Sequence, residues 1–476
     1  MADKFRNRVL VLGGGSVAQT VVPLLIEHEV EANQITIVDM RDTKERFLES
    51  IKKGAKYIND ELTKANMSDF LAKYLSPGDF LLDLAWNIDA NDIMAWAHDN
   101  NVIYLNTSLE LWDPNSNPSA RTPQERTLYY RHMKLRKLTD TWNGEGPTAI
   151  VEHGANPGLV SHLTKKALVE IAEKSISEKA DLPGVAAALA AEDYPKLAQT
   201  LGVKVIHIAE LDTQISDKPK LLNEFVNTWS VEGFYEEGIA PAEMGWGTHE
   251  KKMPANAFTH EGGPQNQIGI AQPGATTWVR SWVPNQENTG MVVRHGEAFT
   301  ISDHLTVWEN GKAVYRPTVH YAYRPTDAAI ASMRELEQMQ WEITPNQRIM
   351  NDEIIDGQDR LGVLLMGHQY KSWWTGSLLN IHDARKLIPG QSATTVQVGS
   401  AVFAAVAWAM HHPDQGYLVP DDLPWREVLA YAEPYWNFVS VQSDWDPIST
   451  RNDLFKGWNG REYDTEDPWQ FTNFLA

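Results

Sequence analysis

Cysteine is absent from the 476 residues of this chain. Its absence excludes disulfide bridges, cysteine zinc ligands and a catalytic thiol, and nothing indicates secretion. Long apolar runs are missing as well: residues 401–410 form the longest, about half the roughly 20 residues of a membrane-spanning helix. The N-terminus enters an apolar strand directly and lacks the features of a signal peptide. We therefore expect a soluble, cytoplasmic protein in which residues 401–410 lie in a buried helix.

Positive charge is scarce relative to negative charge. The chain has 42 Lys and Arg against 63 Asp and Glu, a formal net charge of −21. Such a charge repels phosphate backbones, so we expect neither nucleic acid nor an anionic membrane as a partner, whereas a cationic small molecule is compatible with it. Hydrophobic residues make up 42% and charged residues 22%, which predicts a globular chain of two or more domains.

Two catalytic signatures are also missing. The 15 histidines include no His-Glu-x-x-His motif and no pair at ligand spacing on one predicted helix, so we expect no metal. His411-His412 closes an apolar helix, where favourable interaction with the helix dipole explains the pair. Gly-x-Ser-x-Gly follows no predicted strand, which argues against a Ser-His-Asp hydrolase.

A dinucleotide fingerprint lies near the N-terminus. The strand at residues 8–12 leads into Gly13-Gly-Gly15-Ser16-Val17-Ala18, the Gly-x-Gly-x-x-Ala pattern that opens a helix. Gly13 makes the tight turn, and Gly15 lets the backbone approach the pyrophosphate at the helix N-terminus. The next strand ends in Asp39, which can bind the ribose hydroxyls and favours NAD over NADP, although Arg41 weakens that preference.

Strand and helix continue to alternate up to about residue 151, which predicts an α/β fold with a doubly wound parallel (Rossmann) sheet. The expected strands are 55–58, 79–85, 102–105 and 148–151, and the expected helices are 90–99 and 121–139. Residues that follow the fourth, fifth and sixth strands face the ligand crevice of such a sheet. The resulting set of cofactor-binding residues is Gly13, Gly15, Ser16, Val17, Asp39, Asn87, Thr107 and Asn156. For Asn156-Pro-Gly158, an ordinary turn remains an equal alternative.

After residue 158 the regular alternation stops, which predicts a second α+β domain with a largely antiparallel or mixed sheet. The expected helices are 159–174, 194–202, 326–349 and 393–411, and the expected strands are 204–210, 277–283, 290–294, 298–307 and 314–323. His295-Gly-Glu297 is predicted to lie at a hairpin turn. We divide the chain into an NAD-binding domain (1–155), a substrate-binding and dimerisation domain (156–430) and a tail (431–476) that packs back on the first domain.

The segment Asn227-Thr-Trp229-Ser-Val-Glu-Gly-Phe-Tyr-Glu-Glu237-Gly combines an indole with several carboxylates. Residues 224–231 alternate as a strand does, and the glycines at 233 and 238 argue against a helix, so the acidic residues are expected in a loop. An indole attracts cations over its ring face, and carboxylates supply charge-assisted hydrogen bonds. The segment therefore suits a buried ammonium, although a core Trp beside a solvated acidic loop is the simpler alternative.

Several motifs together resemble those of the bacterial homospermidine synthases, a family within the saccharopine-dehydrogenase-like group. They are Gly-Gly-Gly-Ser-Val-Ala, Gly-Ala-Asn-Pro-Gly, Ile-His-Ile-Ala-Glu, Val-Asn-Thr-Trp-Ser-Val-Glu-Gly-Phe and Tyr-Arg-Pro-Thr-Val-His-Tyr-Ala-Tyr. The resemblance implies a homodimer that retains NAD and joins two putrescines into homospermidine, or uses spermidine. It assigns catalytic roles to the matching residues Trp229, Glu237, Glu210, Asn156, His295, Glu110 and Glu297, with Asp356 or Asp359 as weaker candidates.

One position departs from the family pattern. After the fourth strand the family carries Asp, where this chain has Asn87, and Asp89 is a possible substitute. Two alternatives remain open. One is a reductase of the same fold that consumes NAD(P)H to couple an amine to an aldehyde or keto acid, for which Arg294 or Arg324 would bind a carboxylate. The other is a non-catalytic dinucleotide-binding sensor.

Overall fold

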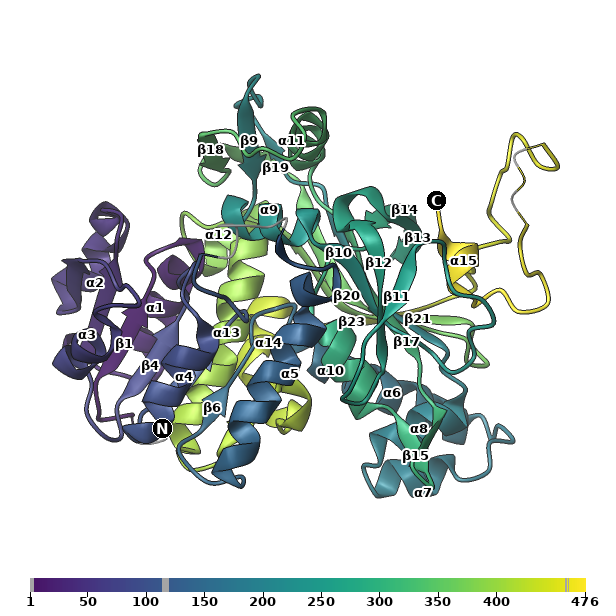
Figure 1. The fold of residues 1–476 in the computed structure, drawn as a ribbon, viewed down its shortest axis with the longest axis horizontal. Helices are drawn as coiled ribbons and strands as arrows, with labels where there is room; N and C mark the ends of the chain where they lie inside the picture. The colour runs from purple at the N-terminus through teal and green to yellow at the C-terminus, as the bar shows by residue number, and fades with distance from the viewer. Residues whose placement is uncertain (1–3, 114–119, 459, 461) are drawn as a thin grey trace.

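The computed structural model of the protein describes residues 4–113, 120–458, 460 and 462–476. Two large sheets lie next to each other, with helices on and between them (Figure 1). The N-terminal strands form one sheet, and most of the later strands form the other (Figure 1). The architecture confirms the predicted class, a parallel Rossmann sheet joined to a second sheet of mixed direction.

The first sheet has seven strands in the order β22-β6-β5-β4-β1-β2-β3, and every pair is parallel. Its strands are β1 (Val9–Leu12), β2 (Ile35–Asp39), β3 (Lys56–Asn59), β4 (Phe80–Asp83), β5 (Ile103–Asn106), β6 (Ala149–Ile150) and β22 (Tyr417–Leu418). The direction in which successive strands are added to the sheet reverses between β1 and β4. In a doubly wound sheet the ligand crevice lies at this reversal, at the carboxyl ends of the strands.

Short helices connect these strands. They are α1 (Ser16–His28), α2 (Leu48–Lys53), α3 (Met67–Tyr74), α4 (Ala90–Asp99) and α5 (Leu128–Thr139). Helix α1 continues through Pro23, and its apolar residues, among them Val21 and Leu25, are fully buried. The apolar stripe therefore fixes α1 against the sheet in spite of the hydrogen bond that proline cannot donate.

The second sheet has ten strands. They are β7 (Val205–Asp212), β10 (Pro241–Gly245), β11 (Ala257–Thr259), β12 (Gln267–Pro273), β13 (Trp278–Val283), β14 (Gln286–Met291), β17 (Thr318–Arg324), β20 (Gln358–Met366), β21 (Ser372–Asn380) and β23 (Val439–Ser443). Strands β7 and β17 pair in parallel at its centre, and the other pairs are antiparallel. Every residue of β7 is buried, so side chains from both faces of this central strand lie inside the protein.

The remaining strands form three two-stranded ribbons. They pair β8 (Ile215–Ser216) with β19 (Ile354–Asp356), β9 (Glu224–Asn227) with β18 (Asn346–Ile349), and β15 (Val307–Glu309) with β16 (Lys312–Tyr315). The remaining helices are α6 (Leu159–Ser177), α7 (Val185–Ala190), α8 (Tyr194–Leu201), α9 (Val231–Ile239), α10 (Gly296–His304), α11 (Asp327–Gln338), α12 (Ile381–Leu387), α13 (Ala393–His411), α14 (Trp425–Trp436) and α15 (Phe471–Phe474).

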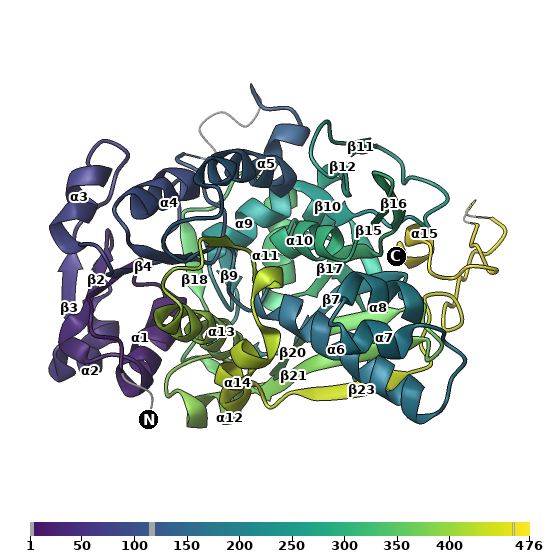
Figure 2. The ribbon, with the colours of Figure 1, turned by 90° about the horizontal axis from the view of Figure 1, so that it is seen from below.

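Helix α13 lies between the two sheets. It packs against α1 of the first sheet's helix layer and against α14, as both views show (Figures 1 and 2). It is long and apolar enough to cross a membrane, but 94% of its most apolar window is buried inside the protein. Residues 401–410 therefore form part of a core helix, as the sequence predicted.

Three local predictions are wrong. Residues 232–238 form helix α9 and not a loop, because Ser230 caps the helix by accepting from the Gly233 N–H at 3.0 Å. The second glycine provides room for packing: a Cβ at Gly238 would meet Met333 Cε at 2.7 Å. His295 likewise precedes helix α10 and does not lie at a hairpin turn, and most of the predicted strand 298–307 belongs to that helix.

The C-terminal tail also packs differently from the prediction. Strand β23 extends the second sheet beside β21, and α15 contacts β13 of the same sheet. Phe471 and Phe474 are fully buried there, in a cluster with Val279 and Trp374. The last aromatic residues of the tail thus bury their surface against the second sheet. At the start of the tail, Tyr435 contacts His28 of α1 at 3.1 Å. A division near residue 155 stays a prediction.

Candidate active site

The turn between β1 and α1 has the geometry that a dinucleotide requires. Gly13 has φ +91°, and a Cβ there would lie 2.7 Å from the Leu84 carbonyl oxygen. No atom lies within 4 Å of a Cβ placed on Gly15, and no side chain caps the N-terminus of α1. The turn therefore leaves open space and free helix N–H groups where a pyrophosphate binds.

Asp39 ends β2 beside this turn. Its carboxylate accepts hydrogen bonds from the Gly14 N–H at 2.5 Å and the Arg41 N–H at 2.7 Å. The Arg41 guanidinium points elsewhere and forms an ion pair with Glu232 of α9 at 2.8 Å. The residues of the turn and of Asp39 together fit NAD.

At the carboxyl edge of the sheet, Asn87 adopts φ 65° and accepts from the Asp113 N–H at 2.6 Å. Asp89 caps helix α4, with Oδ1 accepting from the N–H groups of Asn91 and Asp92. Thr107 follows β5 and lies near Gly154, in the loop that carries Asn156. A role of Asp89 in place of Asn87 stays a prediction.

His295 lies between two carboxylates. Its Nε2 is 3.1 Å from Glu237 of α9, and its Nδ1 is 3.1 Å from Glu297 of α10. His295 is 5% exposed, and burial alone would lower its pKa, but the two carboxylates raise the pKa well above the ordinary value. The ring is therefore a buried imidazolium at neutral pH, hydrogen-bonded to Glu297 through Nδ1 and ion-paired with Glu237 through Nε2.

Glu210 lies on the central strand β7 and is 3% exposed. Asn156 donates a hydrogen bond to its carboxylate at 3.2 Å, and the Tyr321 hydroxyl donates a second one. Burial raises the pKa of Glu210 to about 8, and the neighbouring Asp212 contributes to the rise. Near neutral pH this carboxyl group can therefore gain or lose a proton.

Three rings, those of Trp229, Tyr323 and Tyr321, lie in series and end beside Glu210. Trp229 donates from its indole Nε1 to the Tyr323 hydroxyl at 2.9 Å. Tyr323 stacks on Tyr321 with ring centroids 5.0 Å apart, and Tyr321 in turn lies 4.3 Å from the His295 ring. Both tyrosines come from β17, where residues two apart share a face. A continuous aromatic wall thus joins Trp229 to His295 and passes Glu210.

Sequence reasoning missed the two tyrosines and Asp212, which forms an acidic pair with the weak candidate Asp359. Asp212 and Asp359 lie opposite each other on β7 and β20, and Thr394 at the start of α13 donates to both, at 3.3 and 2.6 Å. Asp359 is fully buried with one oxygen unpartnered, and burial together with Glu210 raises its pKa well above the ordinary value. Asp356, the other weak candidate, is exposed at the end of β19.

Glu110 lies apart from this cluster, beside a second group of charges. Its Oε1 accepts from Ser108 at 3.0 Å, its Oε2 is buried without a partner, and burial raises its pKa to about 8. Glu236 nearby bonds Arg131 at 2.5 Å and also Arg294, and these two cations lower its pKa to about 2. Glu236 is thus ionised, whereas the carboxyl of Glu110 is mostly protonated at neutral pH.

The two arginines considered for a substrate carboxylate are both engaged. Arg294 pairs with Glu236 and donates to the Arg126 carbonyl at 2.7 Å, and Arg324 pairs with Asp327 at 2.8 Å on the protein surface. A carboxylate-bearing substrate would have to displace one of these partners.

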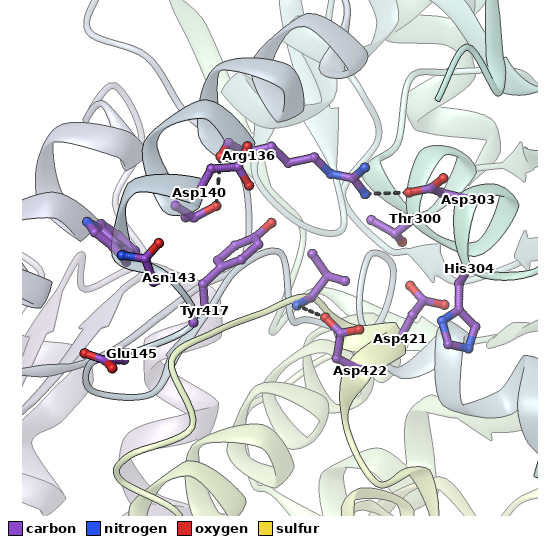
Figure 3. A pocket seen from close by; sticks show the side chains of 14 residues that line it. Arg136, Asp140, Asn143, Glu145, Thr300, Asp303, His304, Tyr417, Asp421 and Asp422 are labelled. Carbon is purple, nitrogen blue, oxygen red and sulfur yellow. Dashed lines mark hydrogen bonds and ion pairs between the residues drawn. The ribbon is translucent and has the colours of Figure 1, made fainter. Parts of the chain in front are cut away.

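A separate pocket of about 550 Å³ opens at the far end of α10, about one helix length from His295 (Figure 3). Acidic side chains surround it, among them Asp140, Asp303, Asp421 and Asp422, and Arg136 is paired with Asp303 at 2.6 Å (Figure 3). None of the predicted catalytic or cofactor-binding residues lines it. This pocket is therefore distinct from the cluster around Glu210.

Comparison with known proteins identifies relatives along nearly the whole chain. The saccharopine dehydrogenase NADP binding domain family matches residues 9–150, and the saccharopine dehydrogenase C-terminal domain family matches residues 154–437. The homospermidine synthase of Blastochloris viridis is 40% identical, over 98% of this chain and 97% of its own length. That of Mesorhizobium japonicum is 38% identical, over 98% and 96%.

A solved structure agrees with these matches. The homospermidine synthase of Legionella pneumophila, crystallised in complex with NAD, has a TM-score of 0.88 with this chain at 35% identity. The match covers 100% of this chain and 98% of that one. The two sheets, the dinucleotide turn and the second domain are therefore all shared with an NAD-binding relative.

Proposed function

This chain belongs to the homospermidine synthase family, and from that premise we propose which of its residues bind and convert the substrate. The chain is an NAD-dependent enzyme of homospermidine synthesis, and its substrates are polyamines. We propose that two putrescines are joined with loss of ammonia, or that spermidine serves as donor with loss of diaminopropane.

The reaction has no net oxidation. Bound NAD supplies a reversible hydride acceptor. The substrate carbon that bears a primary amine is oxidised to an imine, and exchange with a second amine releases ammonia and gives a secondary imine. Reduction of that imine with the same hydride yields homospermidine. The site must therefore hold cationic intermediates and exclude water between the two hydride transfers.

Trp229 stabilises the cationic imine over its ring face. The bond from its indole N–H to Tyr323 fixes the ring plane, and the stacked Tyr321 and Tyr323 extend the aromatic surface towards Glu210. A cation over an indole in a desolvated site gains about 2 kcal/mol. The aromatic wall thus stabilises a positive charge in the middle of the substrate. A carboxylate there would bind the cationic imine too tightly for it to react.

Glu210 and Glu237 bind or deprotonate the ammonium groups at the reacting end. The raised pKa of Glu210, about 8, suits a group that exchanges protons at neutral pH. Glu237 contacts the imidazolium of His295, which Glu297 holds from the other side, so His295 can relay a proton to or from Glu237. Asn156 orients the reacting end by its hydrogen bond to Glu210.

Glu110 anchors the distal ammonium of the substrate. Its carboxyl is buried beside α9 with one oxygen unpartnered, and Glu236 raises its pKa together with burial. An arriving ammonium would favour the ionised form and satisfy that oxygen. A carboxylate at each end of the substrate would match the two positive charges of a diamine.

The single observation that carries these roles is the continuous contact series from Glu237 through His295, Tyr321 and Glu210 to Asn156. Incubation with putrescine and catalytic NAD tests it: homospermidine should form without accumulation of NADH. Stoichiometric NADH would contradict the proposal. In Glu237→Gln we expect turnover to fall by at least about tenfold, as for loss of an acid–base group, with NAD binding retained; unchanged turnover would move the role to another carboxylate.

We also propose a cytoplasmic homodimer that binds neither nucleic acid nor membrane. The net charge of −21 supports the exclusion of polyanionic partners. Sedimentation equilibrium of the full chain should give about twice the 53.6 kDa of one copy, and a mass of one copy would contradict the dimer.

A further inference from the structure

Arg41 occupies the place where many enzymes of this fold recognise NADP. It follows Asp39 by two residues, at the ribose end of the dinucleotide turn, and an arginine there can bind a 2′-phosphate. The family that matches residues 9–150 is described as NADP binding. Asp39 alone therefore leaves the preference between the two nucleotides open, because a phosphate-binding cation stands next to it.

Arg41 is not free to bind phosphate. Its Nη2 lies 2.8 Å from Glu232 Oε1, an ion pair between residues 191 positions apart. The Arg41 side chain is 68% exposed, whereas that of Glu232 is only 18% exposed. The exposed side chain of Arg41 thus forms an ion pair with the carboxylate of Glu232, whose position the protein fixes.

Helix α9 fixes that carboxylate. Glu232 lies in its first turn, where the helix N-terminus favours negative charge, and Ser230 caps the same turn. One turn further on, Glu236 is bound by Arg131 and Arg294. Glu232 therefore cannot follow Arg41 if a nucleotide phosphate attracts the guanidinium away.

We propose that Glu232 determines the cofactor preference of this enzyme: it pairs with Arg41 and so withholds the guanidinium from a 2′-phosphate. The 2′-phosphate of NADP would lose its cationic partner and would also face the carboxylates of Asp39 and Glu232. The ribose hydroxyls of NAD need only Asp39. The element that carries the substrate residues thus also sets the nucleotide specificity.

Calorimetric titration of the full-length, nucleotide-free chain with NAD and with NADP tests this role. In Glu232→Gln, the affinity for NADP should rise at least about fivefold relative to that for NAD, the gain expected from one partly exposed ion pair. NAD affinity should stay within about twofold, which also shows that the variant folds. Arg41→Gln alone should bring no gain, and Glu232→Gln/Arg41→Gln should lose the gain.

Glu45→Gln is the matched control, because Glu45 is exposed after β2 and forms no ion pair with Arg41 among the described residues. An equal gain for NADP in this control, or a gain that persists without Arg41, would reduce the effect to general charge repulsion and overturn the proposal. Equal changes for NAD and NADP in Glu232→Gln would overturn it as well. None of these outcomes depends on homospermidine formation, so they are separate from the tests of the catalytic roles.

Discussion

At the scale of single residues, the site depends on buried groups whose protonation and orientation are fixed by neighbours. Trp229 is a clear case, since its indole N–H bonds Tyr323 and its ring packs 5.9 Å from Phe234. The ring is therefore positioned before a substrate arrives. Positioned groups lower the reorganisation that a cationic intermediate demands.

We expect Trp229→Ala to lower turnover about thirtyfold, which corresponds to the roughly 2 kcal/mol of a desolvated cation–indole contact. NAD binding should persist, because the dinucleotide turn lies in the other sheet. Trp229→Phe, which keeps a ring but not the bond to Tyr323, should recover part of the loss. Steady-state turnover with putrescine measures all three, and near-normal activity of the alanine variant would reduce the indole to a packing residue.

Asp359 gives a prediction of stability against pH. Its pKa is raised by burial and by the neighbouring Glu210 and Asp212, so in the folded protein it binds a proton that the unfolded chain releases above about pH 4. The wild type therefore loses stability as pH rises through the folded pKa. Asp359→Asn removes this loss, because asparagine stays neutral and its oxygen can still accept from Thr394.

The difference in melting temperature between Asp359→Asn and the wild type should thus shift in favour of the variant from pH 6 to pH 9. Thermal unfolding without diamine measures it, and a difference that is constant over this range would contradict the raised pKa.

At the scale of secondary-structure elements, helix α9 contacts both the cofactor-binding turn and the proposed substrate site. Glu232 contacts Arg41 near the cofactor turn, Glu236 contacts the arginines beside Glu110, and Glu237 contacts His295. Trp229 precedes the same helix. A small displacement of α9 would therefore disturb several contacts together.

Gly233→Ala tests this dependence without removing a functional group. A Cβ at Gly233 would lie 2.9 Å from Trp229 Cζ3, so the indole must move. Alanine favours a helix interior by roughly 1 kcal/mol over glycine, so the fold should hold. We expect turnover to fall by about tenfold, from part of the 2 kcal/mol contact, with unfolding in urea little changed. Turnover in Gly233→Ala equal to that of the wild type would contradict the argument.

The sequence predicted the first six strands and helices α1, α4 and α5, because each of these has a strong local pattern. It missed α2, α3 and β22. It failed at α9 and α10, where glycines at 233, 238 and 296 suggest turns. The structure shows that these glycines provide room for Trp229, Met333 and Glu152, of which Met333 and Glu152 lie far away in the sequence. Local patterns do not carry that information. The spacing of Tyr321 and Tyr323 along β17 does predict that they share one face of the strand, but it does not predict which residues they contact.

At the scale of the whole molecule, the chain returns twice to places that no local pattern predicts. Strand β22 joins the first sheet although most strands of the second sheet precede it in the chain, and β23 of the tail joins the second sheet. Both placements depend on apolar surfaces that distant parts of the chain supply. The result places the loops after β5 and β6 beside β7 and α9, so that Asn156 of one part reaches Glu210 of the other.

This arrangement buries several carboxyl groups that are protonated when no cation is present. Glu210 and Glu110 each have a pKa of about 8, and that of Asp359 is raised as well. A diamine that enters among them favours their ionised forms, so binding must expel protons from the protein. The net charge of the cluster then balances that of the substrate.

The most direct test is the number of protons released when putrescine binds to the NAD-loaded enzyme at pH 7, measured by calorimetry in buffers of different ionisation enthalpy. The account predicts release of at least about one proton per site, reduced in Glu210→Gln. Binding heat that is independent of the buffer, in the wild type and in the variant, would show that these carboxyl groups do not receive the diamine.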